Sequence, residues 1–361
     1  MTLERTPLYA EHLALGARLV SFAGFEMPLS YGGILLEHEA VRRRAGLFDL
    51  SHMAQFELRG PGVGAWADRL TVNWVSTMPP GGARYNLFCN DEGGTQDDVI
   101  FYRAAERWLL VCNAANGRKM WTLLTAARSD GVDLDDLRGR AALVALQGPR
   151  SLEILRRVTR DDPGALRYYS CRPMTVSGRR ALVARTGYTG EDGFELFLTA
   201  EDAVAVWRSV LAAGHPEGLE PAGLGARDIL RLEAGMPLYG NELTEEISPL
   251  QAGLGWAVKF EKPIFTGRAA LARQAEKNDF LRIAGVVMEG KAVPRPGYPV
   301  LREGEIVGEV RSGSIGPSLG RNIATVLVRP EVTQPGTRLS IRIRGVEHAA
   351  RVVPLPFYKR G

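Results

Sequence analysis

The chain has 361 residues, of which 45% are hydrophobic and 24% charged, the composition of a globular protein with a sizeable core. Its 45 lysines and arginines only slightly outnumber its 41 aspartates and glutamates, and they are interspersed, which argues against a nucleic-acid-binding arm. No apolar run is long enough to span a membrane, and the N-terminus lacks the apolar segment of a signal peptide. Three widely spaced cysteines without a CxxC pair indicate a reducing compartment, so we expect a cytoplasmic protein.

The first 70 residues predict short helices that alternate with strands. By apolar spacing, helices are expected over 8–15, 34–45 and 61–70, and strands over 18–22 and 55–60. Gly46 is the expected C-cap of the second helix. The aromatic segment 25–33, broken by proline and glycine, is expected to be an ordered loop.

Three consecutive antiparallel strands are predicted over 84–89, 97–103 and 108–113, the first two joined by a turn at 90–94. Asp97 and Asp98 begin the middle strand, although aspartate is depleted in strands. Because adjacent strand residues point to opposite faces and both faces look apolar, at least one carboxylate should border a dry cavity. The alternative is that both aspartates only accept backbone N–H groups of the turn. Tyr85 and Asn113, at neighbouring strand ends, fall within plausible reach of Asp97.

A second α/β segment begins near residue 140. Strands are predicted over 141–146, 181–185 and 194–198, and helices over 150–158, 203–213 and 226–235. Glu195 shares a strand face with Phe197, whereas Arg227 lies in the first turn of its helix, where the macrodipole disfavours a cation. We therefore expect an anion, internal or bound, near Arg227. Beyond residue 281, strands alternate with Gly/Pro turns and predict a small β-barrel-like domain.

Several chemistries are excluded by missing motifs. The sequence has no dinucleotide or P-loop fingerprint, no zinc-binding Cys/His pattern and no G-x-S-x-G elbow, so neither a metal nor a nucleotide is expected. Ser51 and His52 do not form a hydrolase pair, because adjacent strand residues point apart. The candidate site residues that remain after these exclusions are carboxylates, an arginine, aromatic residues and an amide. Together such side chains suit the binding of a flat, nitrogen-rich heterocycle. Glu195 can accept two parallel N–H bonds from such a ring, although a salt-bridged core glutamate is an open alternative.

The motifs in these segments resemble the T-protein of the glycine cleavage system, the aminomethyltransferase family. They lie at residues 6–9, 46–53, 92–98, 187–195, 225–235 and 239–250, in the family's order and over essentially the whole chain. Thr95 and Gln96 stand where the family usually carries two apolar residues, which makes the turn more polar but leaves the aspartate pair in place.

The resemblance implies a reaction and a set of residues. A lipoylated partner, the H-protein, would deliver an aminomethyl group, which passes to tetrahydrofolate with release of ammonia and formation of 5,10-methylenetetrahydrofolate. Asp97 matches the family's key carboxylate, and we expect it to act by positioning and electrostatics; the alternative is that it also accepts a proton as a general base. The positions that match folate-contacting residues are Glu195, Arg227, Tyr188, Asn113, Tyr85 and, near the C-terminus, Tyr358 or Arg360.

The resemblance also implies an α+β fold of three domains around a central folate cavity. The expected bounds are 1–52 with 140–240, 53–139 with 241–278, and 279–361 for the β-barrel-like domain. A monomer is expected, with H-protein as partner and without nucleic acid or membrane. Two rival functions remain open: another folate-dependent one-carbon transferase or demethylase of the same fold, and a non-enzymatic folate-binding paralogue.

Overall fold

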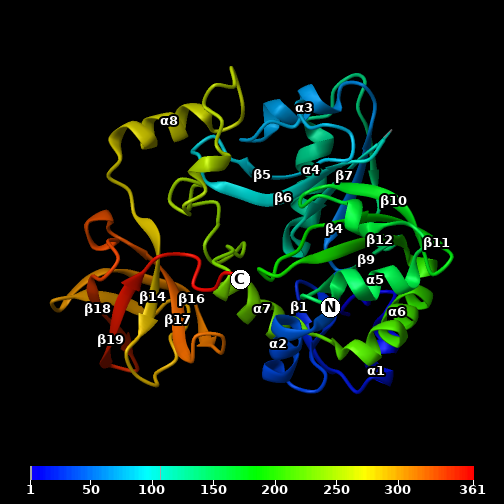
Figure 1. Ribbon diagram of the computed structural model, residues 1–361. Coiled ribbons are helices and arrows are strands. Elements are labelled where there is room, and N and C mark those ends of the chain that lie inside the picture. The colour runs from blue at the N-terminus through cyan, green and yellow to red at the C-terminus, as the bar shows by residue number, and fades with distance from the viewer. Residues whose placement is uncertain (1, 106) are drawn as a thin grey trace. The chain divides into compact units, whose positions relative to one another are not determined.

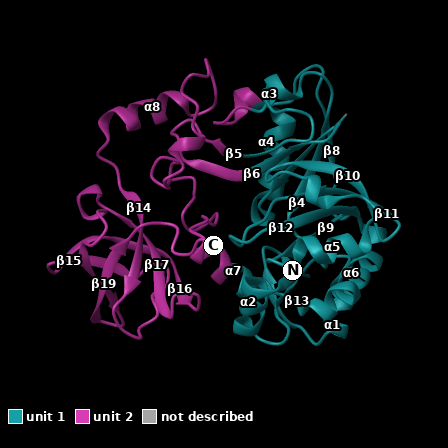
Figure 2. Ribbon diagram, in the orientation of Figure 1, with its two compact units in different colours: residues 1–67, 75–85, 99–228 teal, residues 68–74, 86–98, 229–361 magenta. Residues whose placement is uncertain are grey.

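The computed structural model describes residues 2–105 and 107–361. The chain divides into two compact units, coloured separately in Figure 2: residues 1–67, 75–85 and 99–228 form the first, and residues 68–74, 86–98 and 229–361 form the second. The chain therefore enters the second unit twice for short stretches before it remains there. Among the residues described, no helix is both long and apolar enough to cross a bilayer.

A six-stranded sheet forms the core of the first unit, in the order β10-β11-β12-β9-β3-β13. The strands are β3 (Ala45–Asp49), β9 (Ala141–Gln147), β10 (Cys171–Val176), β11 (Arg179–Ala184), β12 (Gly193–Thr199) and β13 (Leu219–Pro221). β9 is a nearly continuous apolar run, the pattern of a strand buried on both faces. Helices α5 (Ser151–Val158) and α6 (Ala200–Gly214) contribute Leu155 and Trp207 to the core beside this sheet.

A second sheet has five strands in the order β5-β6-β7-β4-β8. They are β4 (Ala54–Arg59), β5 (Ala83–Cys89), β6 (Thr95–Arg103), β7 (Trp108–Cys112) and β8 (Asp133–Asp136). The three consecutive strands predicted for this region are confirmed. β6 and β7 pair antiparallel, with Ile100 opposite Val111 and Tyr102 opposite Leu109.

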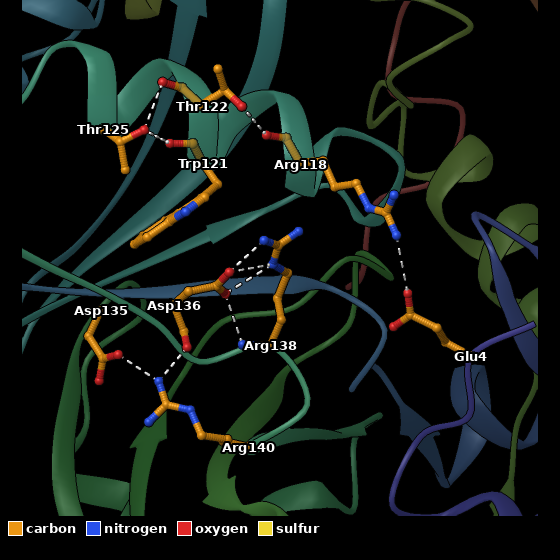
Figure 3. Close-up of polar contacts among 9 residues, drawn as sticks. All are labelled: Glu4, Arg118, Trp121, Thr122, Thr125, Asp135, Asp136, Arg138 and Arg140. Atoms are coloured by element: carbon orange, nitrogen blue, oxygen red, sulfur yellow. Dashed lines mark hydrogen bonds and ion pairs between the residues drawn. The ribbon is translucent and has the colours of Figure 1, made fainter.

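The edge strand β8 is acidic, and arginines of the following segment neutralise it (Figure 3). Arg140 donates to Asp135 at 2.6 Å, and Nε of Arg138 donates to Asp136 at 2.9 Å. A charged edge of this kind discourages pairing with further strands. The sheet therefore ends at β8.

The segment predicted as a loop over 25–33 contains a strand, so that expectation was wrong. β2 (Phe25–Ser30) pairs antiparallel with β1 (Arg18–Phe22). Ala23 and Gly24, between them, have φ values of 50° and 87°, the left-handed pair that closes a two-residue hairpin. The sequence gives little warning of this turn, because alanine is an uncommon residue at positive φ.

The prediction that Gly46 is a helix C-cap was wrong. Helix α2 (Ile34–Arg43) ends earlier, and Gly46 is a residue of β3. A Cβ atom at Gly46 would lie 2.4 Å from Cγ2 of Val41. Close packing between helix and strand therefore explains this glycine. The remaining helices are α1 (Tyr9–Ala14), α3 (Val63–Leu70), α4 (Gly117–Ala126), α7 (Leu224–Glu233) and α8 (Arg268–Lys277).

The C-terminal part of the second unit is a closed six-stranded barrel in the order β14-β17-β16-β15-β18-β19 (Figure 1). Its strands are β14 (Arg282–Met288), β15 (Pro299–Arg302), β16 (Glu305–Gly316), β17 (Arg321–Val328), β18 (Arg338–Ile343) and β19 (Val346–Val353). Buried Val286, Val326 and Ile341 belong to its core. The predicted mixed α/β composition and C-terminal barrel are confirmed, whereas the three-domain ring and its bounds stay a prediction.

Candidate functional site

Asp97 is a fully buried carboxylate of β6, with an exposed fraction of 0%. Along this strand Asp97, Val99 and Phe101 are buried, whereas Asp98 and Ile100 are only partly buried. This alternation matches the prediction that the two aspartates point to opposite faces. Of the pair, Asp97 is therefore the carboxylate withdrawn from water, and Asp98 is the more accessible one.

The turn before Asp97 is fixed within the second unit. The amide of Asn90 donates to the carbonyl of Glu245 at 2.9 Å, and the Gly94 N–H donates to Oδ1 of Asn90 at 2.8 Å. A Cβ atom at Gly94 would lie 1.7 Å from the Glu245 oxygen, so only glycine fits there. The N–H of Thr95 donates to the carbonyl of Thr244 at 2.8 Å. These contacts set the start of β6 and hence the place of Asp97.

Glu195 lies on β12 in the first unit with an exposed fraction of 8%. The hydroxyl of Tyr102 donates to its Oε2 at 2.7 Å, and the hydroxyl of Thr186 donates to the same atom. Burial raises the pKa of Tyr102 well above its usual value, and the Glu195 charge adds to this, so the phenol remains a donor. Both donors reach Oε2, and no described residue donates to Oε1. The carboxylate is thus held by one oxygen while the other can accept a ligand N–H.

Arg227 and Tyr188 are brought together in the first unit. The guanidinium carbon of Arg227 lies 4.6 Å from the centroid of the Tyr188 ring, a cation–π contact. Both residues are partly buried. That an anion lies near Arg227 stays a prediction, but one contact of the Arg227 guanidinium is the aromatic face of Tyr188. The pair offers a ligand a cation beside an aromatic ring.

His52 is a residue that the sequence reasoning set aside and that the structure places near this pair. It is buried, and its Nδ1 has no hydrogen-bond partner among the described residues. Its ring meets Phe22 and Phe25 edge-on, with centroids 5.6 Å and 6.5 Å away. Burial lowers the pKa of His52 to about 4. The negative charge of Asp49 opposes this shift, whereas the positive charge of Arg227 adds to it. The imidazole is therefore neutral near pH 7.

The turn that carries His52 is anchored by a buried network around Asp49. This carboxylate accepts from Thr6 at 2.6 Å, from Nε2 of His12 at 2.9 Å and from the backbone N–H of Ser51 at 2.8 Å. No local sequence signal predicts it, because Thr6 and His12 lie about 40 residues before Asp49. The hydroxyl of Ser51 accepts from the backbone N–H of Leu143 at 3.1 Å, consistent with the exclusion of a Ser–His pair.

The other predicted residues occupy different settings. Asn113 directly follows β7 and precedes a 3₁₀ turn, and Tyr85 lies on β5; both are partly buried and belong to the first unit. Tyr358 and Arg360 belong to the second unit, as does Asp97. Tyr358 is partly buried and its N–H donates to the Glu233 carbonyl at 2.8 Å, whereas Arg360 is exposed. Within the described residues, no cluster of three potential ligands could hold a metal ion.

Comparison with known proteins places this geometry in context. The chain matches the family model of the GCVT N-terminal domain over residues 8–262, and that of the glycine cleavage T-protein C-terminal barrel domain over residues 282–359. It is similar to the aminomethyltransferase of Geobacillus kaustophilus, with 47% identity over 99% of both chains. It is also similar to the aminomethyltransferase of Rubrobacter xylanophilus, with 50% identity over 99% of this chain and 95% of the other.

Among solved structures, the chain is similar to the glycine cleavage system aminomethyltransferase T of Bartonella henselae. The TM-score is 0.93 with 33% identity, covering 99% of this chain and 98% of the other. These matches agree with the resemblance drawn from the sequence motifs, and they extend over both compact units.

Proposed function

Because the chain belongs to the glycine cleavage T-protein family and is therefore a transferase, we propose that it passes an aminomethyl carbon from a lipoylated H-protein to tetrahydrofolate. The carbon leaves the lipoyl sulfur and its own amino nitrogen and becomes bonded to two folate nitrogens. The two hydrogens displaced from those nitrogens leave on ammonia and on the lipoyl thiol. Tetrahydrofolate supplies both nitrogen nucleophiles.

The observation that carries the proposal is the complete burial of Asp97 at the start of β6. A carboxylate kept from water acts more strongly on a nearby charge than a solvated one. A cation develops on the transferred carbon and nitrogen as the carbon–sulfur bond breaks, and Asp97 would stabilise it. The fixed turn before β6 removes the need for the carboxylate to reorganise during transfer.

The polar groups of the first unit suit tetrahydrofolate. Oε1 of Glu195 is available to an N–H of the pterin edge, while Tyr102 and Thr186 hold Oε2. Tyr188 and Arg227 offer an aromatic face and a cation to the remainder of the molecule. We assign Asn113, Tyr85, and Tyr358 or Arg360 to the same ligand. The monomeric state and the cytoplasmic location remain predictions.

The direct test mixes the protein with tetrahydrofolate and an aminomethyl-loaded lipoyl carrier, and measures methylenetetrahydrofolate and ammonia together. Both products should appear in equal amounts and only when all components are present. Replacement of the loaded carrier by an N-methylated amine tests the rival demethylase, which would turn over without the carrier. Folate binding without any turnover would favour the non-enzymatic paralogue.

Asp97→Asn tests the residue assignment. The variant should bind tetrahydrofolate as the wild type does but lose about a hundredfold or more in turnover, the usual cost of removing one electrostatic group. Asp98→Asn is the matched control, because it makes the same change at the neighbouring, more accessible position. Near-normal turnover of Asp97→Asn, or an equal loss in both variants, would contradict the role of Asp97.

A further inference from the structure

The segment after β19 does not trail into solvent but returns to the end of α7, within the second unit. In Figure 1 the red C-terminal segment lies beside this helix. The N–H of Tyr358 donates to the carbonyl of Glu233, the last residue of α7, at 2.8 Å. The last four carbonyls of a helix lack partners within the helix, so this bond satisfies one of them. Chain termini are ordinarily loose unless they are tied down in this manner.

The side chain of Glu233 holds a second segment at the same place. Its exposed fraction is 0%, and it accepts from the backbone N–H of Ser318 at 2.8 Å and from the Ser318 hydroxyl at 2.7 Å. Ser318 lies in the turn between β16 and β17 of the barrel. One residue at the end of α7 thus binds a barrel turn through its carboxylate and the C-terminal segment through its carbonyl.

Apolar packing continues the attachment. Val353 and Phe357 pack against a small cluster formed by Leu232, Val287 and Ile323. Two glycines make the path possible: a Cβ at Gly235 would lie 3.1 Å from the Cα of Pro356, and a Cβ at Gly285 would lie 2.7 Å from Leu355. The position of the segment is therefore built into the helix end and the barrel wall.

We propose that Glu233 is a positioning residue: its carboxylate fixes the end of α7 to the Ser318 turn of the barrel, and the helix end so fixed holds residues 354–358 through the Glu233 carbonyl and thereby sets the position of Tyr358. The inference rests on the proposed function, in which Tyr358 contacts tetrahydrofolate.

A buried carboxylate is a costly means of holding the Ser318 turn to the end of α7, because apolar side chains of similar volume would often do so at no loss of stability. What the carboxylate adds is direction, since its two oxygens accept only from donors at defined places. A purely structural role predicts lower thermal stability alone. A positioning role predicts in addition a selective loss of folate affinity, with the affinity for the carrier protein retained.

The test compares Glu233→Gln, Gly235→Ala and Ser318→Ala in the full-length protein. Hydrogen exchange of the C-terminal peptide measures attachment, and KM for tetrahydrofolate, KM for the loaded carrier and kcat measure its consequence. Glu233→Gln and Gly235→Ala should speed exchange of the peptide and raise the folate KM roughly tenfold, with the carrier KM changed less than twofold. Ser318→Ala removes only a hydroxyl from an exposed turn residue and keeps the N–H donor, so it should fold and raise the folate KM about two- to fourfold.

Glu347→Gln is the matched control. Glu347 accepts from the hydroxyl of Ser340 at 2.6 Å on the same barrel, but it lies at the β18–β19 turn, and all three kinetic constants should stay at wild-type values. Unchanged peptide exchange in all three variants, or faster exchange with an unchanged folate KM, overturns the inference while the proposed function stands. A wild-type protein that neither binds nor uses tetrahydrofolate overturns both.

Discussion

Tyr102→Phe removes one buried oxygen atom from the contact that fixes Glu195. The Tyr102 hydroxyl donates to Oε2 at 2.7 Å, and the exposed fractions of Tyr102 and Glu195 are 1% and 8%. A buried hydrogen bond to a charged group contributes about 1.5–3 kcal/mol, and the donor that remains, Thr186, favours the lower end. The free energy of unfolding should therefore fall by about 1.5 kcal/mol.

Because Glu195 loses its orientation, tetrahydrofolate should bind about tenfold more weakly, a difference of about 1.4 kcal/mol. Calorimetric titration measures this affinity, and denaturant unfolding measures stability. Tyr31→Phe is the control, since it removes a hydroxyl that lies 2.9 Å from Nδ1 of His12, also in the first unit, and should reduce stability without affecting folate. If Tyr102→Phe loses stability but binds folate as the wild type does, Glu195 does not hold the pterin by the geometry described above.

Three further predictions concern buried charges and titrating groups. Glu195→Ala should weaken tetrahydrofolate binding by about 1.5–3 kcal/mol in calorimetric titration, and unchanged binding would assign the pterin edge to another residue. The pKa of His52 is about 4 in the folded protein against an ordinary 6.5, so the unfolded chain binds this proton more readily. As pH drops from 6.5 to 4, the free energy of unfolding of the wild type should therefore fall by about 3 kcal/mol more than that of His52→Gln. Parallel pH profiles of the two proteins would show that this histidine does not titrate as described. Lys262 is buried, donates to the carbonyls of Thr71 and Asn73, and has its pKa lowered by burial to about 8 from 10.5. Wild-type stability should accordingly rise between pH 8 and 10.5 by about 3 kcal/mol more than that of Lys262→Met, which thermal melts across this range would detect or refute.

The parts of the fold and site that could be predicted are those with a local signal. Asp97 and Asp98 stand in an apolar strand directly after a glycine turn, so the burial of at least one of them followed from the two-residue alternation of β6, which did not by itself say that it would be Asp97. The strands of the barrel were predicted from apolar runs between Gly/Pro turns. The exception is β15, whose four residues are too few to show the two-residue alternation of a strand. The β1–β2 hairpin was missed because its turn places Ala23 at a positive φ, a choice that only the pairing of the whole hairpin explains.

The sequence could not predict which residues donate hydrogen bonds to the buried carboxylates. Tyr102 and Glu195 are 93 positions apart, and Glu233 meets a donor 85 positions away at Ser318. A buried carboxylate must find donors somewhere, because leaving it without them costs several kcal/mol, but a strand pattern does not say where along the chain they lie. The residue type of the donor is not fixed either, because a hydroxyl, an amide or a backbone N–H can each satisfy a carboxylate: Tyr102 and Thr186 donate hydroxyls to Glu195, whereas Ser318 donates both a hydroxyl and a backbone N–H to Glu233.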